Sequence, residues 1–141
     1  MSDVREWKWE GHHVRFEPPD MLFHSVSGHT RLTDVHMFLD IYRELGSRAP
    51  FFVVVDLAAA GKLDEDARRN VSENLQTEWF AGVIYLRARL MYRAIAKGIT
   101  VFLRLIGNSS VEPHFVSTEE EARALIDRLR EQRSRGTELH P

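Results

Sequence analysis

The run Phe51-Phe52-Val53-Val54-Val55-Asp56-Leu57 decides the fold class of this chain. It opens with five β-branched or aromatic residues without a polar interruption, which is typical of a strand buried on both faces of a sheet. Such a strand needs a helical layer on each side to exclude water. The run therefore predicts the central strand of an α/β domain, ending near Asp56.

Amphipathic helices are predicted before and after this strand. Before it, apolar residues recur every three or four positions from Val35 to Leu45, with Thr33 as a possible cap and Gly46 as a stop. After it, Asp64 can begin a second helix with acidic residues in its first turn. This alternation of strand and helix favours a sheet covered by helices.

Further strands are predicted toward both ends of the chain. Residues 12–17 alternate between apolar and polar, and residues 21–27 form a second extended run ended by Gly28, so the two are expected to pair antiparallel. Residues 79–86 form another buried strand, and a short one is expected around residues 114–116. The expected fold is an α/β domain with a mixed sheet of about five strands flanked by four helices.

The stretch at residues 88–106 has two interpretations, because residues 99–106 fit a strand by composition alone. At about 100° per residue, however, its side chains sort onto two sides of a helix. The apolar side holds Met91, Ile95, Ile99, Phe102 and Ile106, and the other holds Arg89, Arg93, Lys97, Thr100 and Arg104. We therefore predict a helix, which tolerates Gly98 at a cost of about 1 kcal/mol relative to alanine.

The end of the chain carries one more helix signal. Thr118 and Glu121 have the spacing of a capping box and precede an apolar stripe, which predicts a helix at residues 119–132. From Arg133 onward the apolar period is lost, so this tail is expected to fray. No repeat or linker divides the 141 residues, and we expect a single domain with an ordered core at about residues 11–132.

The composition narrows the function classes. The chain carries 19 Lys and Arg against 21 Asp and Glu, a formal net charge of -2, so binding to nucleic acid or an anionic membrane would need a local patch. It has no cysteine, which excludes disulfides and thiolate catalysis and fits a reducing compartment. Neither an apolar signal segment nor a spanning run is evident in the sequence, and a cytoplasmic location is expected.

Four segments, taken in order, carry a likeness to a known family. They are the extended run ending at Gly28, the strand closing on Asp56-Leu57, Ala67-Arg68 in the second helix, and Phe115-Val116-Ser117-Thr118-Glu119-Glu120-Glu121-Ala122-Arg123. Together they resemble the SpoIIAA-like branch of the STAS superfamily, including its STAS/SEC14-like members, over about residues 11–130. The resemblance implies a mixed sheet flanked by helices, in a group of binding and regulatory modules more than enzymes.

This chain departs from that family at one informative place. In anti-sigma factor antagonists of the wider superfamily, a phosphorylatable Ser or Thr follows the central strand at the start of the next helix. Here that place holds Ala58-Ala59-Ala60-Gly61-Lys62-Leu63, and no hydroxyl side chain occurs between Asp56 and Asn70. Ser72 is the nearest downstream candidate, but it lies inside the predicted helix. We therefore predict that the protein is not switched by phosphorylation at this place.

Five residues are candidates for binding a ligand or partner: Asp56, Arg68, Arg89, Arg93 and Lys97. Asp56 stands at the carboxyl end of the central strand, where open α/β sheets place ligands; the alternative is an aspartate that only caps or hydrogen-bonds the following loop. Arg68 lies near the start of the next helix. The other three belong, with Arg104, to a basic stripe that can meet phosphate headgroups or an acidic partner, or can simply be a solvated helix face.

The sequence carries no motif for catalysis or metal binding. Its seven histidines include no His-Glu-x-x-His, and His12 and His13 point to opposite faces of an extended strand. Ser109-Ser110 lacks the Gly-x-Ser-x-Gly context of a nucleophile elbow, and the glycines are too scattered for a phosphate loop. We therefore expect no catalytic residues, no cofactor and no metal.

Two classes of function stay open. The first is a non-enzymatic regulatory module that binds protein. We expect it to be a homodimer, because apolar residues at the sheet edge can leave a patch for a second copy. Those residues are Trp7, Trp9, Phe16, Met21 and Phe23. The second is a carrier of a small apolar or lipid ligand, implied by the SEC14-like side of the resemblance. An apolar cavity with a polar mouth would favour the carrier, and a filled core would favour the module.

Overall fold

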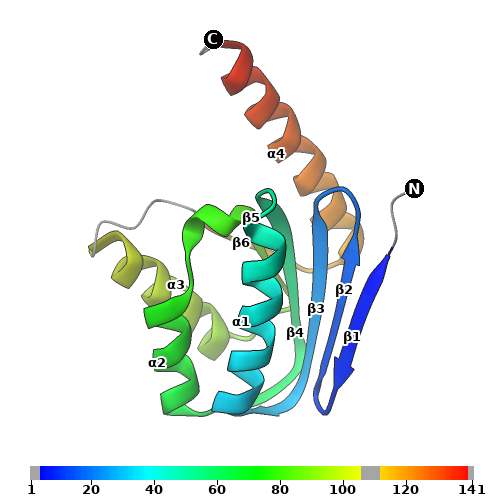
Figure 1. Ribbon diagram of the computed structural model, residues 1–141. Coiled ribbons are helices and arrows are strands. Elements are labelled where there is room, and N and C mark those ends of the chain that lie inside the picture. Colours follow the sequence, from blue (N-terminus) through cyan, green and yellow to red (C-terminus); the bar gives the residue numbers. More distant parts are fainter. Residues whose placement is uncertain (1–3, 106–111, 140–141) are drawn as a thin grey trace.

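The protein folds around one mixed sheet, shown in Figure 1 as a computed structural model that describes residues 4–105 and 112–139. Within these residues the sheet has six strands in the order β1-β2-β3-β4-β5-β6. They are β1 Arg5–Trp9, β2 His12–Glu17, β3 Met21–Thr30, β4 Phe51–Leu63, β5 Phe80–Leu86 and β6 Pro113–Val116. β1, β2 and β3 pair antiparallel, and β3 to β6 pair parallel. The predicted fold class is confirmed, with β1 as a further strand ahead of the predicted core.

Helices cover both faces of the sheet. They are α1 Leu32–Gly46, α2 Glu65–Asn74, the short 3-10 helix η1 Thr77–Trp79, α3 Leu90–Leu105 and α4 Glu119–Leu139. Figure 1 shows α1, α2 and α3 on one side of the sheet and α4 on the other. The stretch with two interpretations is a helix from Leu90 to Leu105, and the strand alternative is wrong there. Ile106 lies outside the described residues.

Two helix ends differ from the prediction. The residue that caps α1 is Arg31, not Thr33, because the Asp34 carboxylate accepts the free backbone N–H of Arg31 at 2.8 Å. At the other end of the chain, α4 continues to Leu139 instead of stopping near residue 132. Each residue added to an existing helix gains a backbone hydrogen bond, so good helix formers such as Glu and Arg extend it without an apolar stripe.

The central strand β4 is longer than predicted. Only its first half, up to Asp56, pairs with β5, and its second half pairs with β3 up to Leu63. The alanine-rich stretch after Asp56 is therefore strand and not loop, because β3 supplies partners for its backbone. Asp56 consequently lies inside β4, where β5 ends, and not at the end of the strand.

Apolar residues form a core on each side of the sheet. On the α1 side, Val53, Phe51 and Leu39 belong to a buried cluster, and a smaller cluster under α3 adjoins it. On the α4 side, Phe52 and Ile126 belong to a second cluster. The alternating side chains of β4 thus contact helices on both faces, as the buried run at residues 51–55 predicts.

The five apolar residues of the opening segment and hairpin do not form the single patch that was predicted, because they are divided between the two faces of the sheet. Trp7, Trp9 and Phe16 pack against the core under α1, and Met21 and Phe23 pack against the core under α4. A homodimer therefore remains a proposal, and this hairpin does not supply the interface that was expected for it.

Two glycines offer a matched test of the helix packing. A Cβ at Gly46, the last residue of α1, would lie 2.4 Å from Cβ of Trp79, whereas a Cβ at Gly98 in α3 meets nothing within 4 Å. We expect Gly46→Ala to lower the free energy of unfolding by about 1–3 kcal/mol through overpacking, and Gly98→Ala to raise it by up to about 1 kcal/mol through helix propensity. Urea melts measure both, and a neutral Gly46→Ala would contradict the close approach of α1 and η1.

Candidate functional site

A cavity lies between the sheet and the helices α1, α2 and α3. Its volume is about 130 Å³, and its wall is mostly apolar. The apolar wall includes Val55 and Val83 from the sheet, Leu63 at the end of β4, Val71 from α2, and Ile95 and Ile99 from α3. Val55 and Val83 stay partly exposed beneath the helices. The helices thus leave unfilled space above the centre of the sheet.

One end of this cavity is polar. His12 on β2, His24 on β3 and Tyr42 on α1 all line it and form a chain of hydrogen bonds. His12 Nδ1 lies 2.9 Å from His24 Nε2, and His24 Nδ1 lies 2.7 Å from the Tyr42 hydroxyl. The Thr30 hydroxyl lies 3.5 Å from His12 Nε2. Three consecutive elements, β2, β3 and α1, therefore place hydrogen-bonding groups together at this wall.

Trp9 and Asp34 close the outer side of this chain of side chains. The Trp9 indole N–H donates to Asp34 Oδ1 at 3.0 Å, and Asp34 Oδ2 lies 3.9 Å from His12 Nε2. The Trp9 ring also stacks on the His12 ring, with 4.9 Å between centroids and 13° between planes. These contacts hold the orientation of His12 from the side away from His24.

Burial keeps the polar end of the cavity uncharged. Desolvation, with a smaller effect from His12, lowers the pKa of His24 to about 3, because the low-dielectric interior disfavours an imidazolium. Desolvation also lowers the pKa of His12, against an opposing effect of Asp34. The pKa of the Tyr42 hydroxyl is raised by burial. At neutral pH the wall therefore offers neutral donors and acceptors, which suit a polar but uncharged ligand group.

Tyr85 on β5 adds a second polar group to the cavity wall. Its ring stacks on Phe115 of β6, with 5.5 Å between centroids and 22° between planes, and burial raises its pKa to about 12. The Tyr85 hydroxyl has no hydrogen-bond partner in the part of the chain that the structure describes. By contrast, the Tyr92 hydroxyl donates to the Gly61 carbonyl oxygen. Tyr85 is thus a donor and acceptor in an apolar cavity that a ligand could satisfy.

Asp56, the predicted site residue on the central strand, lies away from this cavity. Its carboxylate accepts from the Arg87 guanidinium at 2.7 Å and from the Ala58 backbone N–H at 3.0 Å. It lines a separate polar recess of about 200 Å³, together with residues that include Arg15 and Glu119. The ion pair with Arg87 links β4 to the residue after β5, which is a structural role.

The four predicted basic site residues do not come together at one site. Arg68 is exposed on α2, and the Arg89 guanidinium donates to the Ala60 carbonyl oxygen at 2.6 Å, which ties the start of α3 to β4. Arg93 and Lys97 do share a contact, because their charged groups lie 5.3 and 5.8 Å from the Phe115 ring centroid. None of the five predicted residues lines the cavity.

The sequence-based reasoning missed the histidines and tyrosines of the cavity. A signal existed, because alternation in the opening hairpin puts His12 and His24 on the same side as the apolar Val14, Leu22 and Val26. His12 is buried and His13 is not, as the prediction of opposite faces requires. Over residues 4–105 and 112–139, no three acidic, His or Cys side chains gather in a way that could hold a metal ion. Over the same residues, no helix is long and apolar enough to cross a membrane.

Comparison with known proteins supports the fold. No family model matches the sequence, and no curated protein matches it significantly. The unphosphorylated form of the anti-sigma factor antagonist SpoIIAA is similar in structure, with a TM-score of 0.60 and 13% identity over 84% of this chain and 97% of that one. An uncharacterized DUF3478 protein from Shewanella loihica PV-4 with a SpoIIAA-like fold has a TM-score of 0.56 and 12% identity over 87% and 91%. The SpoIIAA-like fold that the sequence resemblance implies is confirmed.

Proposed function

We propose that this protein is a non-enzymatic module that binds a small, mainly apolar molecule in the cavity beneath α1, α2 and α3. The observation that carries this proposal is the cavity itself, an apolar space whose wall holds the hydroxyl of Tyr85 without a partner among the described residues. An apolar pocket with a few convergent polar groups is the usual form of a small-molecule site. The carrier is thus favoured over a module with a filled core.

The volume of the cavity sets the size of the ligand. An engineered apolar cavity of about 150 Å³ binds benzene, so a cavity of about 130 Å³ suits a single ring or a short chain. A whole membrane lipid is too large for it. The uncharged His24 and Tyr42 and the Tyr85 hydroxyl favour a ligand with one neutral polar group, such as a hydroxyl.

Regulation of a protein partner is a second candidate, supported by the likeness to a protein named as an anti-sigma factor antagonist. The cavity suggests how ligand binding and regulation of a partner could be combined in one protein. Val71 of α2 and Leu75 just after it line the cavity, so a ligand that fills it contacts the helix that carries Arg68. In this proposal ligand occupancy would bias a partner surface around α2, in the cytoplasm.

A pair of probes tests the cavity and its polar group together. p-Cresol and toluene share a ring of the same size, but only p-cresol carries a hydroxyl. We expect the native protein to bind p-cresol more tightly than toluene. Tyr85→Phe should weaken the binding of p-cresol by the free energy of one hydrogen bond, about 0.5–1.5 kcal/mol, and leave the binding of toluene unchanged. The Tyr85→Phe ring can keep its stacking on Phe115.

Ligand-observed NMR titrations measure both affinities, and urea melts of the variant serve as the folding control. Failure of both probes to bind the native protein would overturn the proposed function. An equal loss of affinity for p-cresol and toluene in Tyr85→Phe would show that Tyr85 shapes the cavity and does not hydrogen-bond the ligand.

A further inference from the structure

Five large apolar side chains of α3 face solvent. They are Leu90, Met91, Val101, Phe102 and Leu105. The exposed fractions of Leu90 and Leu105 are 83% and 80%, which is unusual for leucines at both ends of a helix in a small domain. Among the described residues, the other large apolar side chains this exposed are Val4 and Met37. The exposed apolar surface of the protein is therefore concentrated on one helix.

These five side chains lie along one side of α3, two near its start and three near its end, with Ala94 and Gly98 between them. At about 100° per residue they fall within an arc of about 120° along α3. Tyr92 and Ala96, which are buried, fall on the opposite side of the helix and face the sheet. Figure 1 shows α3 at one end of the molecule, with its last turns projecting beyond the other helices. The stripe, which we call the α3 stripe, is thus accessible along its whole length.

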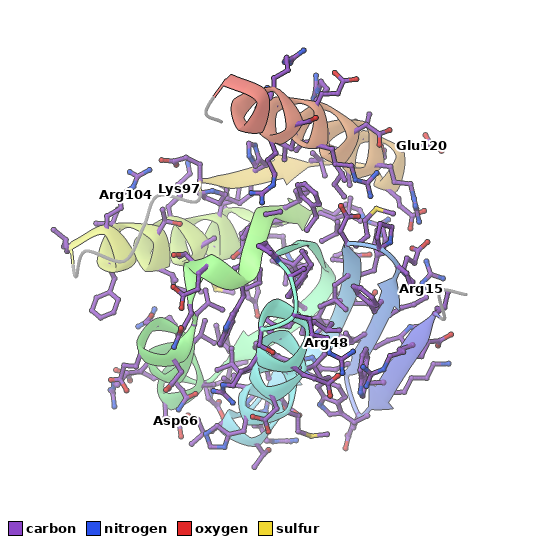
Figure 2. The ribbon with its side chains drawn as sticks, turned by 45° about the horizontal axis from the view of Figure 1, so that its top comes forward. Arg15, Arg48, Asp66, Lys97, Arg104 and Glu120 are labelled. Atoms are coloured by element: carbon purple, nitrogen blue, oxygen red, sulfur yellow. The ribbon has the colours of Figure 1, made fainter. Side chains whose placement is uncertain are left out.

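Basic side chains border the α3 stripe. Arg93, Lys97 and Arg104 fall within about 40° of one another, directly beside Leu90 on the helix surface. Figure 2 shows Lys97 and Arg104 on the same side of α3. Arg104 forms an ion pair with Glu112, whereas Arg93 and Lys97 lie against the Phe115 ring.

The segment around α3 is also unusual in net charge. Between Leu86 and Glu112 the sequence has five Lys and Arg residues and no Asp or Glu, in a chain whose net charge is -2. The local patch that any anionic surface would require is therefore present here, beside the apolar stripe.

We propose that α3 docks this protein onto an anionic lipid surface. The α3 stripe would lie at the boundary between headgroups and acyl chains, and Lys97 and Arg93 would contact headgroup phosphates. A helix with an apolar face next to basic side chains has the form of an interfacial membrane helix. The charge of this segment favours an anionic lipid surface over a second copy of this chain, because a symmetric contact through α3 would bring the same basic side chains together.

This docking does not require an occupied cavity, but it brings the cavity close to the lipid surface. Ile95, Ala96 and Ile99 of α3 line the cavity from the side opposite the α3 stripe. The helix that contacts the lipid surface is therefore also the roof of the binding site. A small apolar ligand that partitions into the bilayer would have a short path to the cavity.

Flotation of the full chain with lipid vesicles tests the docking without any ligand. We expect binding to vesicles of phosphatidylcholine with phosphatidylglycerol, weaker binding in high salt, and little binding to phosphatidylcholine alone. Lys97→Glu should weaken binding to the anionic vesicles by about tenfold or more, because it removes one attractive charge and adds a repulsive one. The double change Leu90→Ser and Leu105→Ser should weaken it to a similar extent.

Two matched variants leave the α3 stripe intact. Arg48→Glu makes the same charge change at an exposed position after α1, and Met37→Ser removes an exposed apolar side chain from α1. Both should bind vesicles like the native protein, and circular dichroism melts check that every variant folds. Failure of the native protein to bind anionic vesicles at low salt would refute docking. Docking would also be refuted by light scattering that shows a dimer lost in the Leu90 and Leu105 variant, since the stripe would then bind a second copy.

Discussion

Acidification from about pH 7 to about pH 4 should lower the free energy of unfolding by about 3 kcal/mol through His24 alone. The pKa of His24 is about 3 in the folded protein, against 6.5 for an ordinary histidine. Between these two values the unfolded chain binds a proton that the folded protein does not bind. The stability contributed by neutral His24 is therefore complete above about pH 6.5 and is lost as the pH falls toward 3.

The surroundings of His24 explain why no other group offsets this loss. Its two ring nitrogens contact His12 and Tyr42, and the Phe38 ring lies edge-on at 5.0 Å between centroids. Neither partner is an acid that could stabilise an imidazolium. Asp34 approaches only His12, whose pKa burial lowers in the same direction. Protonation of the pair therefore opposes folding from both members.

Urea melts across this pH range measure the effect. His24→Gln keeps a polar side chain near Tyr42 but removes the titration, so its stability should depend less steeply on pH than that of the native protein. His36→Gln removes a histidine from the exposed face of α1 and serves as the control. Carboxylates elsewhere with lowered pKa, such as Glu44 and Asp64, add the same slope to all three proteins. An unchanged slope in His24→Gln would contradict the burial of a neutral histidine pair.

Local sequence patterns were sufficient for most of the fold. Five apolar residues in a row at Phe51–Val55 can only be buried on both faces, and this predicts the central strand and two helical layers. The period of α3 decided between helix and strand, because it places Arg93, Lys97 and Arg104 together on one side of a helix. The predicted apolar side is only partly the side that faces the sheet, since Met91 and Phe102 are exposed. Both features depend on neighbours in sequence, and the structure confirms both.

Features that depend on distant partners were not predictable in this way. Ala58–Leu63 has weak strand preference, and it is strand because β3 runs beside it. His12 and His24 meet because of the β2–β3 register, which no short motif encodes. The cavity is harder still to predict from the sequence, because it exists where the side chains of three helices do not fill the space above the sheet. Tyr85 reads in the sequence as an ordinary inward residue of a strand.

Filling the cavity should abolish ligand binding and leave the fold intact. Val83 on β5 lines the cavity and is partly exposed to it, so the larger side chain of Val83→Phe can occupy empty space. We expect the affinity for both p-cresol and toluene to fall by about a hundredfold or more. The free energy of unfolding should change by less than about 1 kcal/mol, because new apolar contacts offset local strain.

A similar enlargement on the other face of the sheet should have the opposite outcome. Ile84, the residue next to Val83 on β5, is 0% exposed and packs within the cluster under α4, and it lines neither the cavity nor the polar recess beside Asp56. Ile84→Phe should therefore lower the free energy of unfolding by about 1–3 kcal/mol and leave the cavity able to bind both probes. NMR titrations and urea melts on the two variants separate binding from stability. If Val83→Phe destabilises the protein as much as Ile84→Phe does, the space beneath α1, α2 and α3 is already filled by the protein's own side chains, and the proposed function is wrong.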